Sequence, residues 1–171
     1  MEINKKYKLE KAVSKDPLRE NLQNIIIQGK QAFATDGYIM AVVPVKLENG
    51  DTPGLLSPDA LKLGRKATSK AFDNITIALD GSQKLQDGAV LPRPEGDHPD
   101  RLQSILSDAQ KKRKFKFGIN VSLLKDLSDA IGADEVVLEL AAPDKAILVR
   151  PLKNGEGEKG IIMPVQVKED K

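Results

Sequence analysis

The stretch Ala34-Thr35-Asp36-Gly37-Tyr38-Ile39-Met40 is typical of the corner of a β-hairpin. Its Asp-Gly pair predicts a tight turn, because glycine accepts the positive φ that hairpin turns require. Apolar strands are predicted on both sides of this turn, over residues 31–35 and 38–45. Another strand is predicted over 22–27, joined to the first by a turn at Gln28-Gly29-Lys30. This region therefore predicts three antiparallel strands.

Two helices are predicted from the residues that begin them. Ser57-Pro58 begins the first, since serine caps free helix amides and proline fits the first helical position. Asn120 caps the second, and Gly132 ends it. The strands predicted after the two helices are Asn74–Leu79, with alternating Ile75, Ile77 and Leu79, then Ala89–Leu91, Glu135–Leu140, Ala146–Arg150 and Gly160–Val167.

The two helical regions repeat one pattern. Gly54-Leu55-Leu56-Ser57 is followed about 63 residues later by Gly118-Ile119-Asn120, within a strand predicted over Phe115–Asn120. Each copy is a βαβββ unit, which predicts an α+β fold with two helices packed on antiparallel sheets. Two copies make one complete two-helix domain and leave three N-terminal strands over. These strands imply either a shortened second domain or a sheet shared between subunits.

The boundaries of the domains follow from composition. Residues 1–20 are charged and weakly patterned, which favours a short helical or irregular segment. Residues 92–100 hold three prolines and predict a linker, after which Leu102, Ile105 and Leu106 should dock on a surface. We expect a domain over 1–97, a linker over 98–112 and a half domain over 113–171.

Composition limits the classes of protein that fit. The chain has 171 residues, 40% hydrophobic and 30% charged, which is typical of a globular protein. It has no cysteine, which excludes disulfides and thiolate metal sites, and its net charge is only +2. No apolar run is long enough to span a membrane, and the polar N-terminus lacks the apolar part of a secretory signal. We expect a cytoplasmic protein.

Little in the sequence points to catalysis. Gly155-Glu156-Gly157-Glu158-Lys159-Gly160 fits a dinucleotide motif, but a strand follows it and two glutamates would repel phosphate, so we interpret it as a hairpin loop. His98 is the only histidine, which argues against a zinc site and against a nucleophile–His–Asp triad. We expect no enzyme, no cofactor and no metal.

In this order, the segments resemble the bacterial DNA sliding clamp, the β subunit of DNA polymerase III. Ala34-Thr35-Asp36-Gly37 is identical to the hairpin motif of the clamp's middle domain, and Asp16–Ile27 resembles the segment before it. Pro99-Asp100 matches the start of the interdomain linker. Phe117–Leu127 resembles the last helix of the third domain, and Met163-Pro164-Val165 resembles the C-terminal Met-Pro motif.

The chain departs from the clamp pattern in two ways. Tyr38-Ile39 stands where the family usually has His-Arg, so the cation after the hairpin turn is missing. The chain also carries about one and a half domains instead of three. The first helix of the middle domain and the first half of the third domain are absent. The reduced size fits a phage or a mobile element.

The resemblance implies two functional surfaces. One is an apolar pocket that binds the Leu or Phe anchors of polymerase-type peptides, formed by Leu22, Thr35, Tyr38, Ile39, Met40, Pro99, Ser104 or Ile105, Ile161 and Met163. The other is a phosphate-binding surface on duplex DNA, formed by Lys62, Arg65, Lys66, Lys70, Lys111, Lys112, Arg113 and Lys125. For each residue taken alone, an ordinary core or surface role remains open.

These observations lead to a hypothesis of a non-enzymatic, clamp-like replication processivity factor. Its expected partners are DNA polymerase or other clamp-binding peptides and duplex DNA. It is expected to be a homo-oligomer, in which four chains would supply the six domains of a clamp ring. The alternative is a decoy or regulator that binds the same peptides without DNA. An enzyme with an unrecognised site is the third hypothesis.

Overall fold

The computed structural model describes residues 1–99, 101–110, 116–153 and 158–167. The chain forms two compact units, unit 1 over Met1–Ser107 and unit 2 over Asp108–Lys171. In the described part of the chain, no helix is long and apolar enough to cross a membrane. The fold is α+β with antiparallel sheets, as the sequence predicts, and the described residues contain a third helix that it does not predict.

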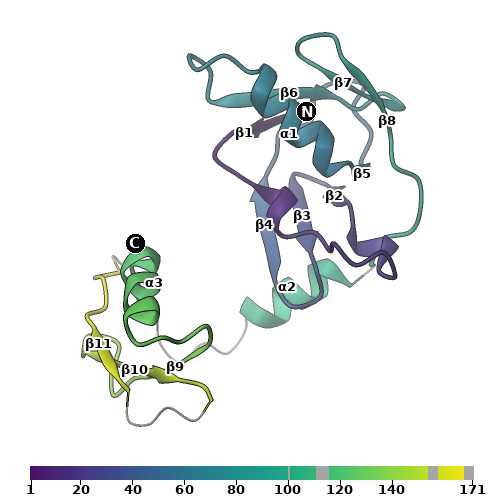
Figure 1. The fold of residues 1–171 in the computed structure, drawn as a ribbon. Helices are drawn as coiled ribbons and strands as arrows, with labels where there is room; N and C mark the ends of the chain where they lie inside the picture. Colours follow the sequence, from purple (N-terminus) through teal and green to yellow (C-terminus); the bar gives the residue numbers. More distant parts are fainter. Residues whose placement is uncertain (100, 111–115, 154–157, 168–171) are drawn as a thin grey trace. The chain divides into compact units, whose positions relative to one another are not determined.

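Unit 1 contains two four-stranded antiparallel sheets (Figure 1). The strands of the first sheet are, in spatial order, β1 (Glu2–Asn4), β6 (Asn74–Ala78), β7 (Ser82–Leu85) and β8 (Val90–Pro92). The strands of the second sheet are β4 (Met40–Pro44), β3 (Gln31–Thr35), β2 (Ile25–Gln28) and β5 (Gly54–Leu56). The predicted hairpin turns at Gly29 and Gly37 are confirmed, and both glycines have positive φ.

The two halves of unit 1 exchange their first strands. β1 begins the first half of the unit and pairs with β6 of the second half, with Ile3 opposite Ile75. β5 begins the second half and pairs with β2 of the first, with Leu55 opposite Ile26. The three strands over 22–45 therefore do not lack a partner within the chain, because β5 pairs with the outer edge of β2.

The prediction of a helical or irregular segment over 1–20 is wrong at its start. Met1 and Ile3 are buried, and β1 begins at Glu2. The strand has only three residues, so its alternation is too short to stand out in the sequence. Two short 3₁₀ turns, η1 (Leu9–Lys11) and η2 (Glu20–Leu22), follow β1.

Helix α1 (Pro58–Ala67) packs directly on β6. It begins as predicted, with the Ser57 hydroxyl accepting a hydrogen bond from the Ala60 amide at 3.0 Å. Gly64 permits the close approach, since a Cβ there would lie 2.7 Å from Ile75 Cγ2. The predicted alternation of Ile75, Ile77 and Leu79 is confirmed, because all three are fully buried in an aliphatic core.

The segment around η1 packs on α1 in place of a first helix. The Arg65 side chain donates hydrogen bonds to the carbonyl oxygens of Lys5 and Tyr7, at 3.1 and 2.7 Å. It also forms a two-pronged ion pair with Glu10 at 2.7 and 3.0 Å. Burial raises the pKa of Glu10, but hydrogen bonding and the charge of Arg65 outweigh burial, so its pKa lies below the usual value.

The unpredicted helix is α2 (Leu102–Gln110), within the segment expected as a linker. Leu102 is buried with Ile26, Phe33 and Leu55, and Leu106 packs against the same cluster. These contacts place α2 on the face of the second sheet that points away from the aliphatic core.

Unit 2 consists of helix α3 (Val121–Ala130) and a three-stranded antiparallel sheet (Figure 1). The sheet order is β11 (Gly160–Ile162), β10 (Ile147–Pro151) and β9 (Val136–Glu139). Asn120 caps α3 as predicted, accepting from the amides of Ser122 and Leu123. Gly132 lies just beyond the helix with a φ of +66°, as its predicted role requires.

Two predicted strands of unit 2 are shorter in the structure. The strand expected over Phe115–Asn120 is reduced, in its described part, to one bridge between Gly118 and Val165. The strand expected over Gly160–Val167 ends at Ile162. Pro164 explains this end, because proline has no amide hydrogen to continue the ladder.

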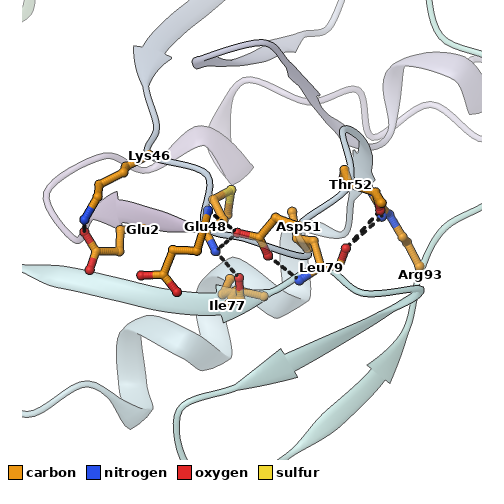
Figure 2. Close-up of polar contacts among 9 residues, drawn as sticks. Glu2, Lys46, Glu48, Asp51, Thr52, Ile77, Leu79 and Arg93 are labelled. Carbon is orange, nitrogen blue, oxygen red and sulfur yellow. Dashed lines mark hydrogen bonds and ion pairs between the residues drawn. The ribbon is translucent and has the colours of Figure 1, made fainter.

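Asp51 fastens the loop between β4 and β5 to the first sheet (Figure 2). Its buried carboxylate accepts hydrogen bonds from the Met1 amino group, from the Glu48 amide at 2.7 Å and from the Leu79 amide at 2.9 Å. Burial raises the pKa of Asp51, but these three donors outweigh burial and leave its pKa below the usual value.

Asp51→Asn is expected to lower the free energy of unfolding by about 2–3 kcal/mol, because it removes the carboxylate charge that these three donors share. The loss should be present above the ordinary carboxyl pKa of about 3.9. It should shrink as the pH falls through the lowered pKa, because the wild-type carboxylate then also becomes protonated. Urea denaturation at several pH values measures both effects.

The matched control is Glu2→Gln, which breaks the exposed pair between Glu2 and Lys46 in the same region. We expect it to cost less than about 1 kcal/mol. Equal losses for the two variants would contradict the anchoring role of Asp51.

Candidate functional site

The β3–β4 hairpin corner is held by a compact set of hydrogen bonds. The Thr35 hydroxyl donates to the Ile39 carbonyl at 2.6 Å and accepts from the Gly37 amide at 3.1 Å. The Asp36 carboxylate accepts from the amides of Ile39 and Tyr38, which hold the pKa of Asp36 below its usual value. The corner is therefore rigid and presents its next two side chains outward, with Tyr38 84% and Ile39 55% exposed.

Arg19, which no sequence motif identifies as a site residue, lies against this corner. Its Nη1 donates to the Asp36 carbonyl at 2.8 Å, and its guanidinium lies 5.4 Å from the centre of the Tyr38 ring. Leu22 also lies at the corner, since its Cδ1 is 3.8 Å from where a Gly37 Cβ would be. Arg19 thus brings a cation to a hairpin that lacks one in its own sequence.

A surface hollow of about 400 Å³ adjoins the corner. Its lining includes Arg19, Asp36 and Tyr38 together with residues of the segment 11–16. The hollow is therefore mixed in character, with charged groups beside the tyrosine ring. The sequence shows that a cation is missing after Asp36-Gly37. It does not show that Arg19, which is distant in the sequence, supplies a cation at this place.

The other predicted pocket residues of unit 1 are spread along the fold. Met40 is half-buried and packs against the cluster that holds Leu102. Ile105, on α2, is 52% exposed. Ser104 is exposed, and its hydroxyl donates to the Arg101 carbonyl. Pro99 is half-buried.

Unit 2 carries the remaining two pocket residues, Ile161 and Met163, which are 67% and 64% exposed. Met163 lines a hollow of about 510 Å³ together with Phe117, Pro143 and the segment 164–167. Within the described residues 161–167, the exposed side chains are thus mainly apolar. Exposed apolar side chains gathered in this way are typical of binding surfaces.

The predicted DNA-binding residues differ in how free their charges are. Lys66 and Lys70 are exposed on and after α1. Lys62 pairs with Asp59 at 3.1 Å, and the donors of Arg65 are engaged within unit 1. Lys125 on α3 pairs with Asp129 at 2.8 Å, and hydrogen bonding to Asp129 raises the pKa of Lys125. Lys111, Lys112 and Arg113 lie outside the described residues.

Comparisons with known proteins give a fold and no sequence relative. No protein-family model matches the chain, and no curated protein does. Three similar solved structures are the β subunit of DNA polymerase from Streptococcus pyogenes, the β chain of DNA polymerase III from Streptococcus pneumoniae and the DNA polymerase sliding clamp from Caulobacter crescentus. All three are 15% identical to this chain, with TM-scores of 0.62, 0.63 and 0.62.

The matches cover 97%, 99% and 99% of this chain but only 50%, 50% and 51% of the three structures. The resemblance expected from the hairpin and tail motifs is therefore confirmed at the level of the fold. The chain has the fold of the bacterial DNA sliding clamps, the β subunits of DNA polymerase III, and spans about half the length of those it matches.

Proposed function

We propose that this protein is a non-enzymatic, clamp-like factor of cytoplasmic DNA replication that binds polymerase-type peptides. The observation that carries the proposal is the clamp fold over nearly the whole chain. It is supported by exposed apolar side chains at the positions that the resemblance assigns to the peptide pocket, above all Tyr38, Ile39, Ile161 and Met163.

The chemistry of these residues suits short peptides with Leu or Phe anchors. Such anchors bind preformed apolar surfaces, and the hydrogen bonds of Thr35 and Asp36 preform the hairpin that carries Tyr38 and Ile39. Methionine adapts its shape to different ligands, so Met163 suits a surface that serves several partners.

Titration of a short, fluorescently labelled peptide with Leu and Phe anchors tests peptide binding. We expect Tyr38→Ala and Met163→Asp each to weaken binding by about 30-fold or more, as is usual for the central contacts of an interface. Fluorescence anisotropy measures the dissociation constants.

The control is Leu152→Asp, which changes a residue 55% exposed in unit 2 but outside the proposed pocket. It should bind the peptide as the wild type does. Unchanged binding in the Met163→Asp variant would exclude Met163 from the peptide-binding residues, and unchanged binding in both test variants would overturn the proposal of peptide binding.

We further propose that oligomers of the chain encircle duplex DNA, with the exposed lysines on and just after α1 close to phosphates. Changing Lys62, Lys66 and Lys70 together to Glu should weaken duplex binding and make it less dependent on salt. Each lost phosphate contact lowers the slope of log affinity against log salt by about 0.9. Anisotropy of a labelled duplex at several salt concentrations measures both quantities.

The matched control changes Lys15, Lys30 and Lys84 to Glu, which alters the net charge equally at exposed lysines elsewhere in unit 1. If the proposed surface binds phosphates, the Lys62, Lys66 and Lys70 variant should lose much more duplex affinity than this control. Equal effects would show attraction by net charge alone and would contradict the proposed phosphate surface.

A second candidate function is a decoy or regulator that binds clamp ligands without DNA. The ion pairs of Lys62 with Asp59 and Lys125 with Asp129, and the engagement of Arg65, favour it because they occupy cations that would otherwise meet phosphates. Peptide binding without salt-dependent duplex binding would identify this function.

A further inference from the structure

Unit 1 shows how two βαβββ-like halves of this fold close one another. Glu2 of β1 exchanges hydrogen bonds with Lys46, the second residue after β4 of its own half, at 2.7 and 3.0 Å. On its other side, β1 pairs with β6 of the opposite half, with Glu2 opposite Thr76. β1 therefore lies between the C-terminal segment of its own half and β6, the first strand after the helix of the other half.

Unit 2 repeats the same arrangement on one side only. Gly118, in the strand position before α3, bridges Val165, which follows β11 as Lys46 follows β4. The Val165 amide donates to the Gly118 carbonyl at 2.9 Å. β9 is the counterpart of β6, but in the sheet order β11-β10-β9 it is an edge strand. Among the described residues of unit 2, no strand takes the place that β1 has beside β6.

The helices show the same difference. When Ser57 and Asn120 are aligned as caps, Ala60, Leu61 and Gly64 of α1 correspond to Leu123, Leu124 and Leu127 of α3. All three positions are buried in α1, which is covered by the segment around η1. None is fully buried in α3, and Leu123 is 54% exposed. Leu124 and Leu127 pack against the core of unit 2, so Leu123 is the position that, among the described residues of unit 2, lacks the cover that Ala60 has in α1.

We propose that unit 2 is completed by unit 2 of a second copy of this chain. Two copies related by a twofold axis would form one closed domain, in which each first strand pairs with the partner's β9 and the two α3 helices pack together. The register of β5 on β2 predicts the pairing, with Ile119 opposite Val136 and Gly118 opposite Val137.

A second copy fits this surface better than another part of the chain. The missing half must supply a first strand with one free side and an apolar helix face. The two halves of unit 1 already use theirs on each other, through β1 with β6 and β5 with β2. Unit 2 itself has both a first strand with a free side and an apolar helix face. Two copies of unit 2 can therefore complete each other through a symmetric, self-complementary interface. The inference rests on the fold of unit 2 and not on the proposed function.

Sedimentation velocity of the full chain over a range of concentrations tests the interface. We expect a reversible dimer, and Leu123→Asp should raise its dissociation constant at least tenfold. Leu152→Asp is the matched control, since Leu152 is equally exposed but follows β10, which lies on the side of β9 opposite its free edge. A wild-type chain that stays monomeric, or equal dimerisation of both variants, would overturn the proposal.

Cysteine cross-linking tests the register, and the absence of natural cysteines makes its result unambiguous. Ile119→Cys and Val136→Cys chains are prepared separately, mixed and oxidised. Opposite residues on antiparallel strands lie within disulfide range, so the mixture should give linked dimers. Neither variant alone, nor Ile119→Cys mixed with Leu152→Cys, should do so. Dimers in solution without links in the first mixture would assign the interface to another surface and overturn the proposal.

Discussion

β1 and β5 each leave the half of the sequence that they begin and pair with a strand of the other half. The two halves of unit 1 are therefore connected through backbone hydrogen bonds as well as through the aliphatic core between the two sheets. Other features depend on this exchange. It gives β2 a partner on its outer edge, and it holds the loop containing Asp51 against the end of β6. It also brings the segment around η1 onto α1, where Arg65 binds it.

Local chemistry determines the parts of the fold that the sequence predicts well. Ser57 and Asn120 cap helices because a short polar side chain satisfies free amides a few residues away. Ile75 and Ile77 alternate because one face of β6 is buried. β1 and α2 escaped prediction because tertiary contacts create them. Ile3 gains its strand from a partner 72 residues later, and Leu102 gains its place from a pocket made by three strands.

The candidate site shows the same division. The sequence identifies Tyr38 and Ile39 because they follow a recognisable turn, and both are exposed at that turn. It does not identify Arg19, whose contact with Tyr38 depends on how η2 and the hairpin meet. Nor does the sequence distinguish Arg65 from its lysine neighbours, although its donors are directed to Glu10 and two carbonyl groups. A count of cations on a helix therefore overstates the charge available to an external phosphate.

The exchange of β1 has a consequence for synthesis on the ribosome. β1 is made before its partner β6, which ends at Ala78, so the strand must wait for most of unit 1 before it can pair. Closing the long loop between β1 and β6 costs conformational entropy before the strand pairing contributes any stabilisation. Pairings between segments so far apart in the sequence make folding slow. During that interval β1 is unpaired, and the apolar side chains of Met1 and Ile3 are exposed to solvent. Until β6 is made, the nascent chain therefore carries an unpaired strand edge that is open to mispairing.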